Sequence, residues 1–297
     1  MLRPQSAEKN YCAGTYNNLP PEELEAATAT AHEQGMAVVG HIPRGAGRDQ
    51  ALQRALMAGQ DMIAHGEEYF FTYFHSDVDS VLDRGEVPFP DERRVPDAVR
   101  MTREAGTTVT PNLSFVAMTR RQLDDMEAVL ADPETRYLHP NVLAMWQTQN
   151  PTRRSDLERF DKREQAKYAF LKKLTKALND AGVPLLLGTD ASVFGLFPGK
   201  SAHVELRELV EAGLTPYEAL ATGTRNAGAF MNEYVPSTKP FGIIARGQQA
   251  NLILVQGNPL EDIRNTMNIS GVMVRGRWLT SAELEQAREE IATSYGR

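Results

Sequence analysis

Short apolar runs alternate with helical patterns along the first two thirds of the chain. Each run ends in glycine or polar residues: GMAVVGHI (35–42), DMIAHGEE (61–68), GTTVTPNLSF (106–115) and VPLLLGTDAS (183–192). Continuous apolar runs of this kind are typical of strands buried within a parallel sheet. The alternation therefore predicts an α/β fold with a parallel sheet or barrel.

The segments between the runs carry the start and stop signals of helices. Residues 20–35 begin with two prolines and acidic side chains and end at glycine. Residues 48–59 and 170–182 repeat an amphipathic pattern that glycine closes. Proline and acids near the start and glycine after the end are the expected order of signals, so we predict helices in all three places.

The pattern changes near the C-terminus. Residues 241–259 and 271–280 contain short β-type runs with glycines between them and no crossover helix, and a helical pattern closes the chain. This change predicts a barrel-type unit over residues 1–238 and a small β unit with a terminal helix over residues 239–297.

A long polar insertion interrupts the alternation between Thr119 and Lys162. A long connection after a strand end is often a lid or an element that shapes a substrate site. A plain surface elaboration would give the same pattern, so both interpretations stay open.

Composition and charge narrow the class of protein. A chain of 297 residues with 41% hydrophobic residues can bury a large core. Its net charge of −7 argues against a nucleic-acid or anionic-membrane partner. The single cysteine, Cys12, excludes an internal disulfide. No apolar stretch approaches the ~20 residues of a membrane span, and the first residues lack the apolar core of a signal peptide, so we expect a cytoplasmic protein.

Three potential metal ligands occupy equivalent positions after the apolar runs. His41 ends the first run, His65 follows the second, and Asp190 ends the last. In closed α/β barrels the carboxyl ends of the strands converge on one mouth. Imidazole and carboxylate ligands suit Zn²⁺ or a similar divalent ion. Any one of these residues alone would more often be structural, but their matched positions favour a metal site.

The other histidines give weaker signals. His203 begins a helical pattern just beyond Asp190, where it could point back toward the site on the substrate side, cap the helix or pack against it. His32, His75 and His139 lie in a helical pattern, after an aromatic run and in the polar insertion, and we expect surface or packing roles for them.

Several segments together carry a resemblance to a known family. They are VVGHIPRG, IAHGEE, LLLGTDAS, HVELRELVEAGLTPYEALATGTRNAG and GQQANLILVQGNPLEDIRNTMNISGVMVRGRWL. From about residue 9 to residue 280, the chain resembles the second half of the amidohydrolase superfamily, in the branch of imidazolonepropionase-like and prolidase-like metal-dependent hydrolases. The resemblance implies part of a distorted (β/α)8 barrel of the TIM type, together with a piece of a small β-sandwich built from both chain ends.

The resemblance also implies roles for the strand-end residues. His41 and His65 would hold the second metal of the family and Asp190 the first, with Asp190 also accepting a proton from water. The family's His-x-His pair, which completes the first metal site, does not occur in this sequence. We therefore expect one divalent ion, zinc before others, and an incomplete second site.

Further departures from the family pattern concern a lysine and an aspartate. The lysine that bridges two metals in many members aligns with Gly14, and the nearest lysine is Lys9, five residues earlier. Asn251 stands where members usually have aspartate. Eight βα units usually take about 250 residues, and the first recognisable strand here corresponds to the fourth or fifth strand of the family. We therefore expect half of the barrel to be absent from this sequence.

Two functional hypotheses follow. The resemblance implies a hydrolase for carbon–nitrogen bonds outside ordinary peptides, such as those of cyclic amides, N-acyl amino acids or imidodipeptides, with a small molecule as substrate. The alternative is a truncated, non-catalytic remnant that binds a ligand or partner. A third possibility is that the start codon was assigned too far downstream, which would restore the first hypothesis. A piece of a barrel also exposes strand edges, which predicts homo-oligomers or aggregation.

Overall fold

A parallel sheet forms the centre of the molecule. The computed structural model describes residues 11–44, 48–74, 90–235 and 239–297. Its parallel strands, in the order β1-β2-β3-β4, are β1 (Cys12–Thr15), β2 (Ala37–Gly40), β3 (Met62–Ala64) and β4 (Thr108–Thr110). Sequence order and spatial order agree, so each helical connection returns the chain to the next strand, as in a (β/α) barrel.

A fifth extended segment continues the sheet beyond β4. Leu185 forms an isolated parallel bridge with Val109, whose amide donates to the Pro184 carbonyl at 3.0 Å and whose carbonyl accepts from Leu186 at 2.9 Å. The run at 183–192 therefore lies where a further strand was predicted, although its pairing is limited to one bridge. The sheet is a partial barrel of the TIM type.

Two of the predicted strands are shorter than their apolar runs. β4 ends at Thr110, because Pro111 has no amide hydrogen to donate and a helix begins at Leu113. β3 ends at Ala64, and residues 67–69 are already helical. The sequence pattern located both strands but overextended them at their carboxyl ends.

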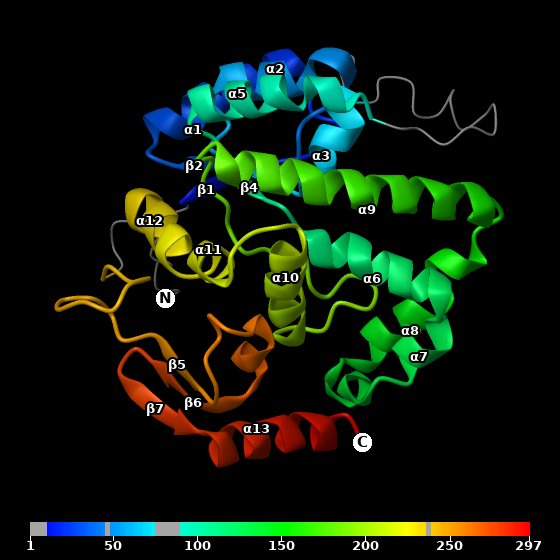
Figure 1. Ribbon diagram of the computed structural model, residues 1–297, viewed down its shortest axis with the longest axis vertical. Coiled ribbons are helices and arrows are strands. Elements are labelled where there is room, and N and C mark those ends of the chain that lie inside the picture. The colour runs from blue at the N-terminus through cyan, green and yellow to red at the C-terminus, as the bar shows by residue number, and fades with distance from the viewer. Residues whose placement is uncertain (1–10, 45–47, 75–89, 236–238) are drawn as a thin grey trace, which may run out of the picture.

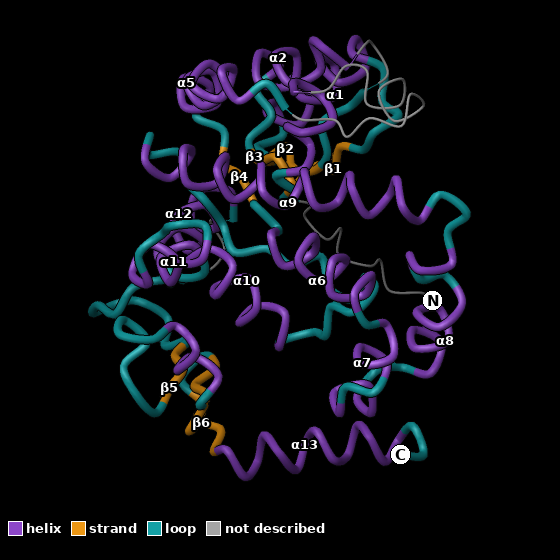
Figure 2. Tube along the Cα trace, turned by 45° about the vertical axis from the view of Figure 1, so that its right-hand side comes forward, coloured by secondary structure: helices purple, strands orange, loops and turns teal. Residues whose placement is uncertain are grey.

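Helices pack around the sheet, and Figure 1 shows α1, α2 and α5 together at one end of the molecule with α9 crossing beside them. The α-helices are α1 (Pro21–Glu33), α2 (Arg48–Ala58), α3 (Glu67–Tyr69), α5 (Val95–Ala105), α6 (Leu113–Asp124), α7 (Met126–Leu130), α8 (Pro140–Thr148), α9 (Leu157–Asp180), α10 (Lys200–Glu211), α11 (Pro216–Thr222), α12 (Arg225–Tyr234) and α13 (Ser281–Ser294). A π-helical turn, η1 (Phe70–Phe74), and short 3-10 turns, η2 (Glu92–Arg94), η3 (Pro133–Tyr137), η4 (Pro151–Arg153) and η5 (Ile263–Met267), complete the set. Figure 2 shows the strands between α1 and α2 on one side and α9 on the other.

The main hydrophobic core lies between the sheet and these helices. Ile63 of β3 and Val109 of β4 are fully buried, and Leu52 of α2 and Phe170 of α9 belong to the same cluster. These strand side chains are buried where the sheet packs against its helices, as expected for parallel strands covered by helices.

Residues 216–234 form two helices, α11 and α12, and not one continuous helix. The carbonyl of Thr222 accepts a hydrogen bond from the amide of Leu187 at 3.2 Å. A Cβ at Gly223 would lie 2.9 Å from the Leu187 side chain. This close approach of the fifth extended segment ends α11 before α12 begins.

A second, antiparallel sheet follows α12. It contains β5 (Leu252–Val255), β6 (Ile269–Val274) and β7 (Arg277–Thr280) in the order β5-β6-β7, and α13 contacts it. β5 therefore pairs with β6 and not with the parallel sheet. The boundary between residues 238 and 239 stays a prediction, since residues 236–238 lie outside the described ranges.

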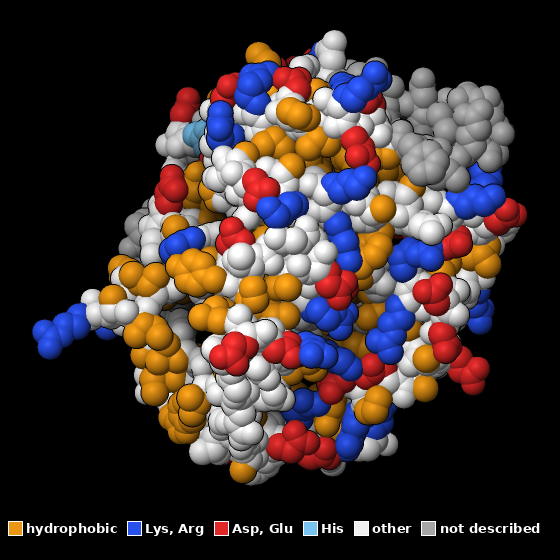
Figure 3. All heavy atoms as spheres, viewed as in Figure 1, with side chains coloured by type: hydrophobic (Ala, Val, Ile, Leu, Met, Phe, Trp, Pro, Cys, Tyr) orange, Lys and Arg blue, Asp and Glu red, His pale blue; other side chains and the backbone are white. Residues whose placement is uncertain are grey.

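The antiparallel sheet leaves apolar side chains uncovered. Ile253 and Leu254 of β5 are 58% and 55% exposed, and Val274 and Trp278 are exposed as well. Figure 3 shows hydrophobic side chains gathered on this part of the surface. In the part of the chain that the structure describes, no helix has both the length and the apolar character needed to cross a membrane.

Candidate active site at the strand ends

Two histidines meet at the carboxyl ends of neighbouring strands. His41 directly follows β2 and His65 directly follows β3, and these strands pair in parallel. The centroids of the two imidazole rings lie 4.8 Å apart with an interplanar angle of 52°. The edge of the exposed Tyr16 ring, which follows β1, contacts His41 at a centroid distance of 4.8 Å. The matched positions of the histidines in the sequence thus correspond to neighbouring positions in space.

Asp190 lies close enough to influence the His65 ring. Burial lowers the pKa of His65, and the negative charge of Asp190 is the strongest influence in the opposite direction. Among the described residues, no group of three or more His, Cys, Asp or Glu side chains is arranged to hold a metal ion. The histidine pair offers two imidazole donors of the kind that divalent metals prefer, while Asp190 as the third ligand stays a prediction.

The backbone at the strand ends has an unusual conformation. Four residues other than glycine have positive φ in the described ranges, and three of them are His65 (72°), Asn112 (53°) and Asp190 (56°). The fourth, Arg275, lies in the hairpin turn between β6 and β7. Strained backbone of this kind persists only where the surrounding structure holds it, and it often occurs at functional sites.

Asn112 is a candidate that the sequence analysis missed. It lies two residues after the end of β4, and it is 4% exposed. Its Oδ1 atom is buried without a hydrogen-bond partner and would lie 2.8 Å from a Cβ placed on Gly188. The strand-end position in the sequence gives a signal for Asn112, but an amide side chain there does not suggest metal binding.

Glu68 fixes the orientation of His41. The Glu68 side chain is fully buried, and its Oε1 atom accepts hydrogen bonds from His41 Nδ1 at 2.8 Å and from Arg44 Nη2 at 2.7 Å. A neutral imidazole that donates from Nδ1 leaves the lone pair of Nε2 free. A carboxylate in this position behind a metal-binding histidine selects the tautomer and raises ligand basicity.

This geometry predicts the tautomer of His41. In the metal-free protein with a neutral His41 ring, ¹⁵N NMR is expected to show the proton on Nδ1. Glu68→Gln retains an acceptor oxygen and should retain this tautomer, whereas Glu68→Ala should shift the population toward the Nε2-protonated form. An unchanged tautomer in Glu68→Ala would contradict the positioning role.

A buried ion-pair cluster lies behind His65. Lys167 of α9 is 3% exposed, and its Nζ atom lies 2.8 Å from Glu67 Oε2 and 2.7 Å from Glu164 Oε2. Burial raises the pKa of Glu67, but the Lys167 ammonium more than offsets this effect, so the pKa is lowered overall. Burial lowers the pKa of Lys167, but the two carboxylates outweigh it and raise the pKa overall. The cluster joins α9 to the segment that carries His65.

Glu205 holds the start of α6. From α10, its fully buried carboxylate accepts hydrogen bonds from the amides of Leu113 at 3.1 Å and Ser114 at 2.6 Å. These amides belong to the first turn of α6, where backbone donors lack helical partners. Burial is the main cause that raises the pKa of Glu205 from 4.5 to about 7.

The raised pKa predicts a pH-dependent contribution to stability. A carboxyl whose pKa is higher in the folded state stabilises the protein fully below the unfolded value, and the contribution is lost as pH rises through about 7. Relative to Glu205→Gln, the wild type is expected to lose about 3 kcal/mol of unfolding free energy between pH 4 and pH 8. Urea unfolding across this range measures the difference, with Glu211→Gln on the exposed part of α10 as control. Parallel pH profiles for the wild type and Glu205→Gln would contradict it.

The remaining sequence candidates have packing contacts. His203 Nδ1 lies 3.0 Å from Thr266 Oγ1, and a role on the substrate side stays a prediction. His32 Nε2 hydrogen-bonds Asp61 at 2.9 Å, and His139 caps α8. Gly14 lies in β1, and a Cβ there would meet no atom within 4 Å, so steric crowding does not require glycine. His75 and Lys9 lie outside the described residues.

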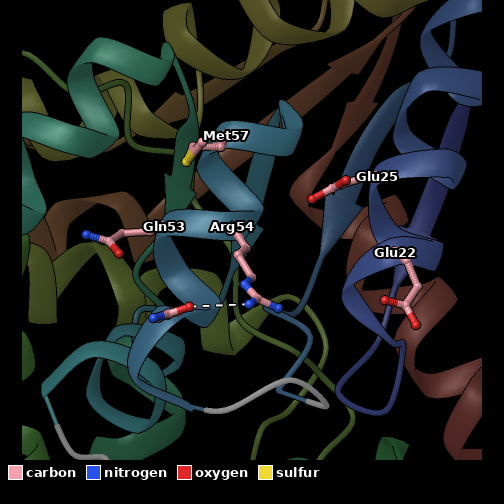
Figure 4. A pocket seen from close by; sticks show the side chains of 6 residues that line it. Glu22, Glu25, Gln53, Arg54 and Met57 are labelled. Atoms are coloured by element: carbon pink, nitrogen blue, oxygen red, sulfur yellow. Dashed lines mark hydrogen bonds between the residues drawn. The ribbon is translucent and has the colours of Figure 1, made fainter.

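A shallow groove lies apart from the strand ends, between α1 and α2. It has a volume of about 420 Å³ and is lined by Glu22, Glu25, Gln50, Gln53, Arg54 and Met57. Figure 4 shows the acidic side chains of α1 across from Arg54, which donates to Gln50 at 3.3 Å. The groove shares no residue with the histidine pair.

Parallel strands with polar side chains gathered at their carboxyl ends define a protein of the (β/α)-barrel class. Residues 15–279 match the amidohydrolase family, and the chain belongs to that family. Over 85 residues it is 39% identical to ochratoxinase from Aspergillus niger, a match that covers 28% of this chain and 16% of the ochratoxinase.

Solved structures show the same fold. A bottromycin amidohydrolase matches with a TM-score of 0.63 and 24% identity, covering 96% of this chain and 59% of its own. A Xaa-Pro dipeptidase with methionine in its active site matches with a TM-score of 0.56 and 22% identity, and the match covers 89% of this chain and 49% of the dipeptidase. Phenylurea hydrolase B matches with a TM-score of 0.52 and 18% identity, and the match covers 90% of this chain and 48% of the hydrolase. This chain thus spans about half the length of these solved relatives and a smaller share of the ochratoxinase.

Proposed function

We propose that this protein is a metal-dependent hydrolase of carbon–nitrogen bonds outside ordinary peptides, acting on a small molecule such as a cyclic amide, an N-acyl amino acid or an imidodipeptide. The observation that carries the proposal is the contact of His41 and His65 at neighbouring strand ends, with Asp190 within electrostatic reach. Membership of the amidohydrolase family supports the reaction class, and the names of the dipeptidase and amidohydrolase neighbours support the kind of bond.

In this proposal His41 and His65 hold one divalent ion, zinc before others. Glu68 keeps the Nε2 atom of His41 available by accepting the hydrogen bond from Nδ1. A divalent ion in this position supplies a polarising charge for a carbonyl oxygen and for the attacking water. In this proposal a second metal site stays incomplete, because the sequence has no His-x-His pair and Gly14 stands at the position of the bridging lysine.

Asp190 is the general acid–base group of the proposed reaction. A carboxylate beside the histidine pair accepts a proton from the attacking water and returns it to the leaving nitrogen. Breakage of a carbon–nitrogen bond requires this second transfer, because an amine leaves readily only when protonated. The positive φ of Asp190 turns this residue out of the extended segment that precedes it.

A non-catalytic remnant is the second candidate. The observation that favours it is that the described residues contain no ready-made group of three metal-ligating side chains. In that case the chain would keep the fold and a ligand or partner surface without turnover. Even under the first proposal we expect the turnover number of this chain to fall below the usual range of roughly 1–10³ per second. The reason is that this chain forms only part of the barrel, and a substrate is held in position by side chains from the opposite wall as well.

Metal content and turnover together test the proposal. The purified chain is stripped with a chelator, reconstituted with Zn²⁺ or Mn²⁺, and assayed with N-acyl amino acids, imidodipeptides and lactams. We expect close to one retained ion per chain and hydrolysis that the chelator abolishes. Loss of the ion on desalting together with no metal-dependent turnover would support the remnant instead.

A further inference from the structure

The helical insertion after β4 packs onto the loop that follows Asp190. The insertion contains α6, α7 and α8, and the loop spans residues 191–199 before α10 begins. In Figure 1 the insertion helices lie together on the side of α10 away from α11 and α12. The sequence left open whether this segment is a lid or a surface elaboration. Its contacts suggest a different role.

Trp146 of α8 makes the most buried of these contacts. It is fully buried, and its indole Nε1 donates a hydrogen bond to the carbonyl of Ser192 at 3.3 Å. The ring meets Phe197 edge to face at a centroid distance of 5.2 Å. Trp146, Phe197 and Leu138 form a small core of their own, with Phe194 packed against it. The loop is therefore anchored two residues after Asp190.

α6 holds the same loop from a second position. Gln122, 1% exposed, donates from Nε2 to the carbonyl of Phe194 at 3.1 Å. Met118 and Val129 pack on Leu196 of the loop. These contacts belong to small buried cores, whereas a lid that opens has few buried contacts.

We propose that the insertion is a fixed clamp that positions Asp190, with Trp146 and Gln122 as its positioning residues. Asp190 has a left-handed backbone, which persists only where neighbouring contacts hold it. The preceding segment is held by β4, and the clamp holds the following one, so the turn at Asp190 is fixed from both sides. The catalytic meaning of the clamp rests on the proposed function, whereas its effect on the loop does not.

The test measures the loop directly in the metal-free protein. Within the loop, the amide of Val193 donates to the Asp190 carbonyl and that of Leu196 to the Val193 carbonyl, so hydrogen exchange at these amides reports opening. Trp146→Phe keeps an aromatic ring in the small core but removes the Nε1 donor. Gln122→Met keeps the volume but removes the amide donor.

Each variant is expected to raise exchange at the two loop amides about tenfold, the effect of losing one buried hydrogen bond. Trp278→Phe is the matched control, because Trp278 is the other tryptophan and lies on β7, 39% exposed. It should leave the loop amides unchanged. If wild-type hydrolysis is measurable, Trp146→Phe should lower kcat with little change in KM.

Unchanged exchange at both amides in Trp146→Phe and Gln122→Met, or an equal rise in Trp278→Phe, would overturn the clamp. If Trp146→Phe fails to fold, Gln122→Met alone decides, since it removes a donor from the other side of the loop. A wild type without metal-dependent hydrolysis would refute the proposed function and leave the exchange result standing. Faster exchange with an unchanged kcat in an active protein would show that the clamp holds the loop without positioning Asp190.

Discussion

Asp190→Asn is expected to lower metal-dependent hydrolysis by about 10²–10⁴-fold, the usual contribution of a general acid–base group. Asparagine has nearly the same shape as aspartate, and it adopts the left-handed conformation of Asp190 readily. The substitution therefore removes the carboxylate while keeping the backbone. The measurement is kcat/KM with the best substrate of the panel, together with unfolding in urea to show that stability is unchanged.

Asp180→Asn provides the matched control for this effect. Asp180 is an exposed carboxylate at the end of α9, paired with Lys176. Its change should leave kcat/KM within about twofold, because surface ion pairs contribute little. Retention of more than a tenth of the activity in Asp190→Asn would show that the proton moves through another group.

Lys167→Met is expected to lower the free energy of unfolding by about 3–5 kcal/mol at pH 7, the usual effect of removing one partner from a buried ion pair. Methionine fills a similar volume and opens little cavity, but the change leaves Glu67 without its ammonium partner and Glu164 with Arg163 as its remaining partner. The difference in unfolding free energy between the wild type and Lys167→Met should become smaller toward pH 5, because the carboxylates that have lost the lysine can then bind protons. Urea unfolding at both pH values measures it.

The same helix offers a control for the lysine. Lys162 pairs with Glu158 at 2.7 Å on the exposed side of α9, so Lys162→Met should lower stability by no more than about 0.5 kcal/mol. A loss below about 1 kcal/mol for Lys167→Met would mean that solvent reaches the buried carboxylates and that the cluster stabilises the site far less than its burial indicates.

The alternation of runs and helical patterns predicted most of the central fold. All four runs fall on the sheet, and the helices predicted from their start and stop signals form, because apolar runs and helix start and stop signals are local properties of the sequence. The carboxyl ends of the strands were harder to locate. β4 ends before Pro111, whose missing amide hydrogen is a local signal, whereas the break between α11 and α12 at Gly223 depends on the close approach of Leu187 from another segment. The division at residue 239 stays a prediction.

The site was predictable only in part. His41 and His65 could be paired because both follow apolar runs directly, and parallel strands convert that equivalence into contact. Glu68 and Lys167 could not be found in this way. Each acts through burial and through partners far apart in the sequence, and no local pattern shows that a charged side chain in a helical segment turns inward.

The left-handed residues at the strand ends carry a conformational cost that glycine would avoid. Glycine adopts that conformation freely, whereas a side chain costs roughly 1–2 kcal/mol there, somewhat less for asparagine and aspartate. Glycine at His65, Asn112 or Asp190 would relieve this backbone cost but would remove the side chain that the strand end presents. Three such residues on one edge of one sheet therefore concentrate backbone strain where the candidate site lies.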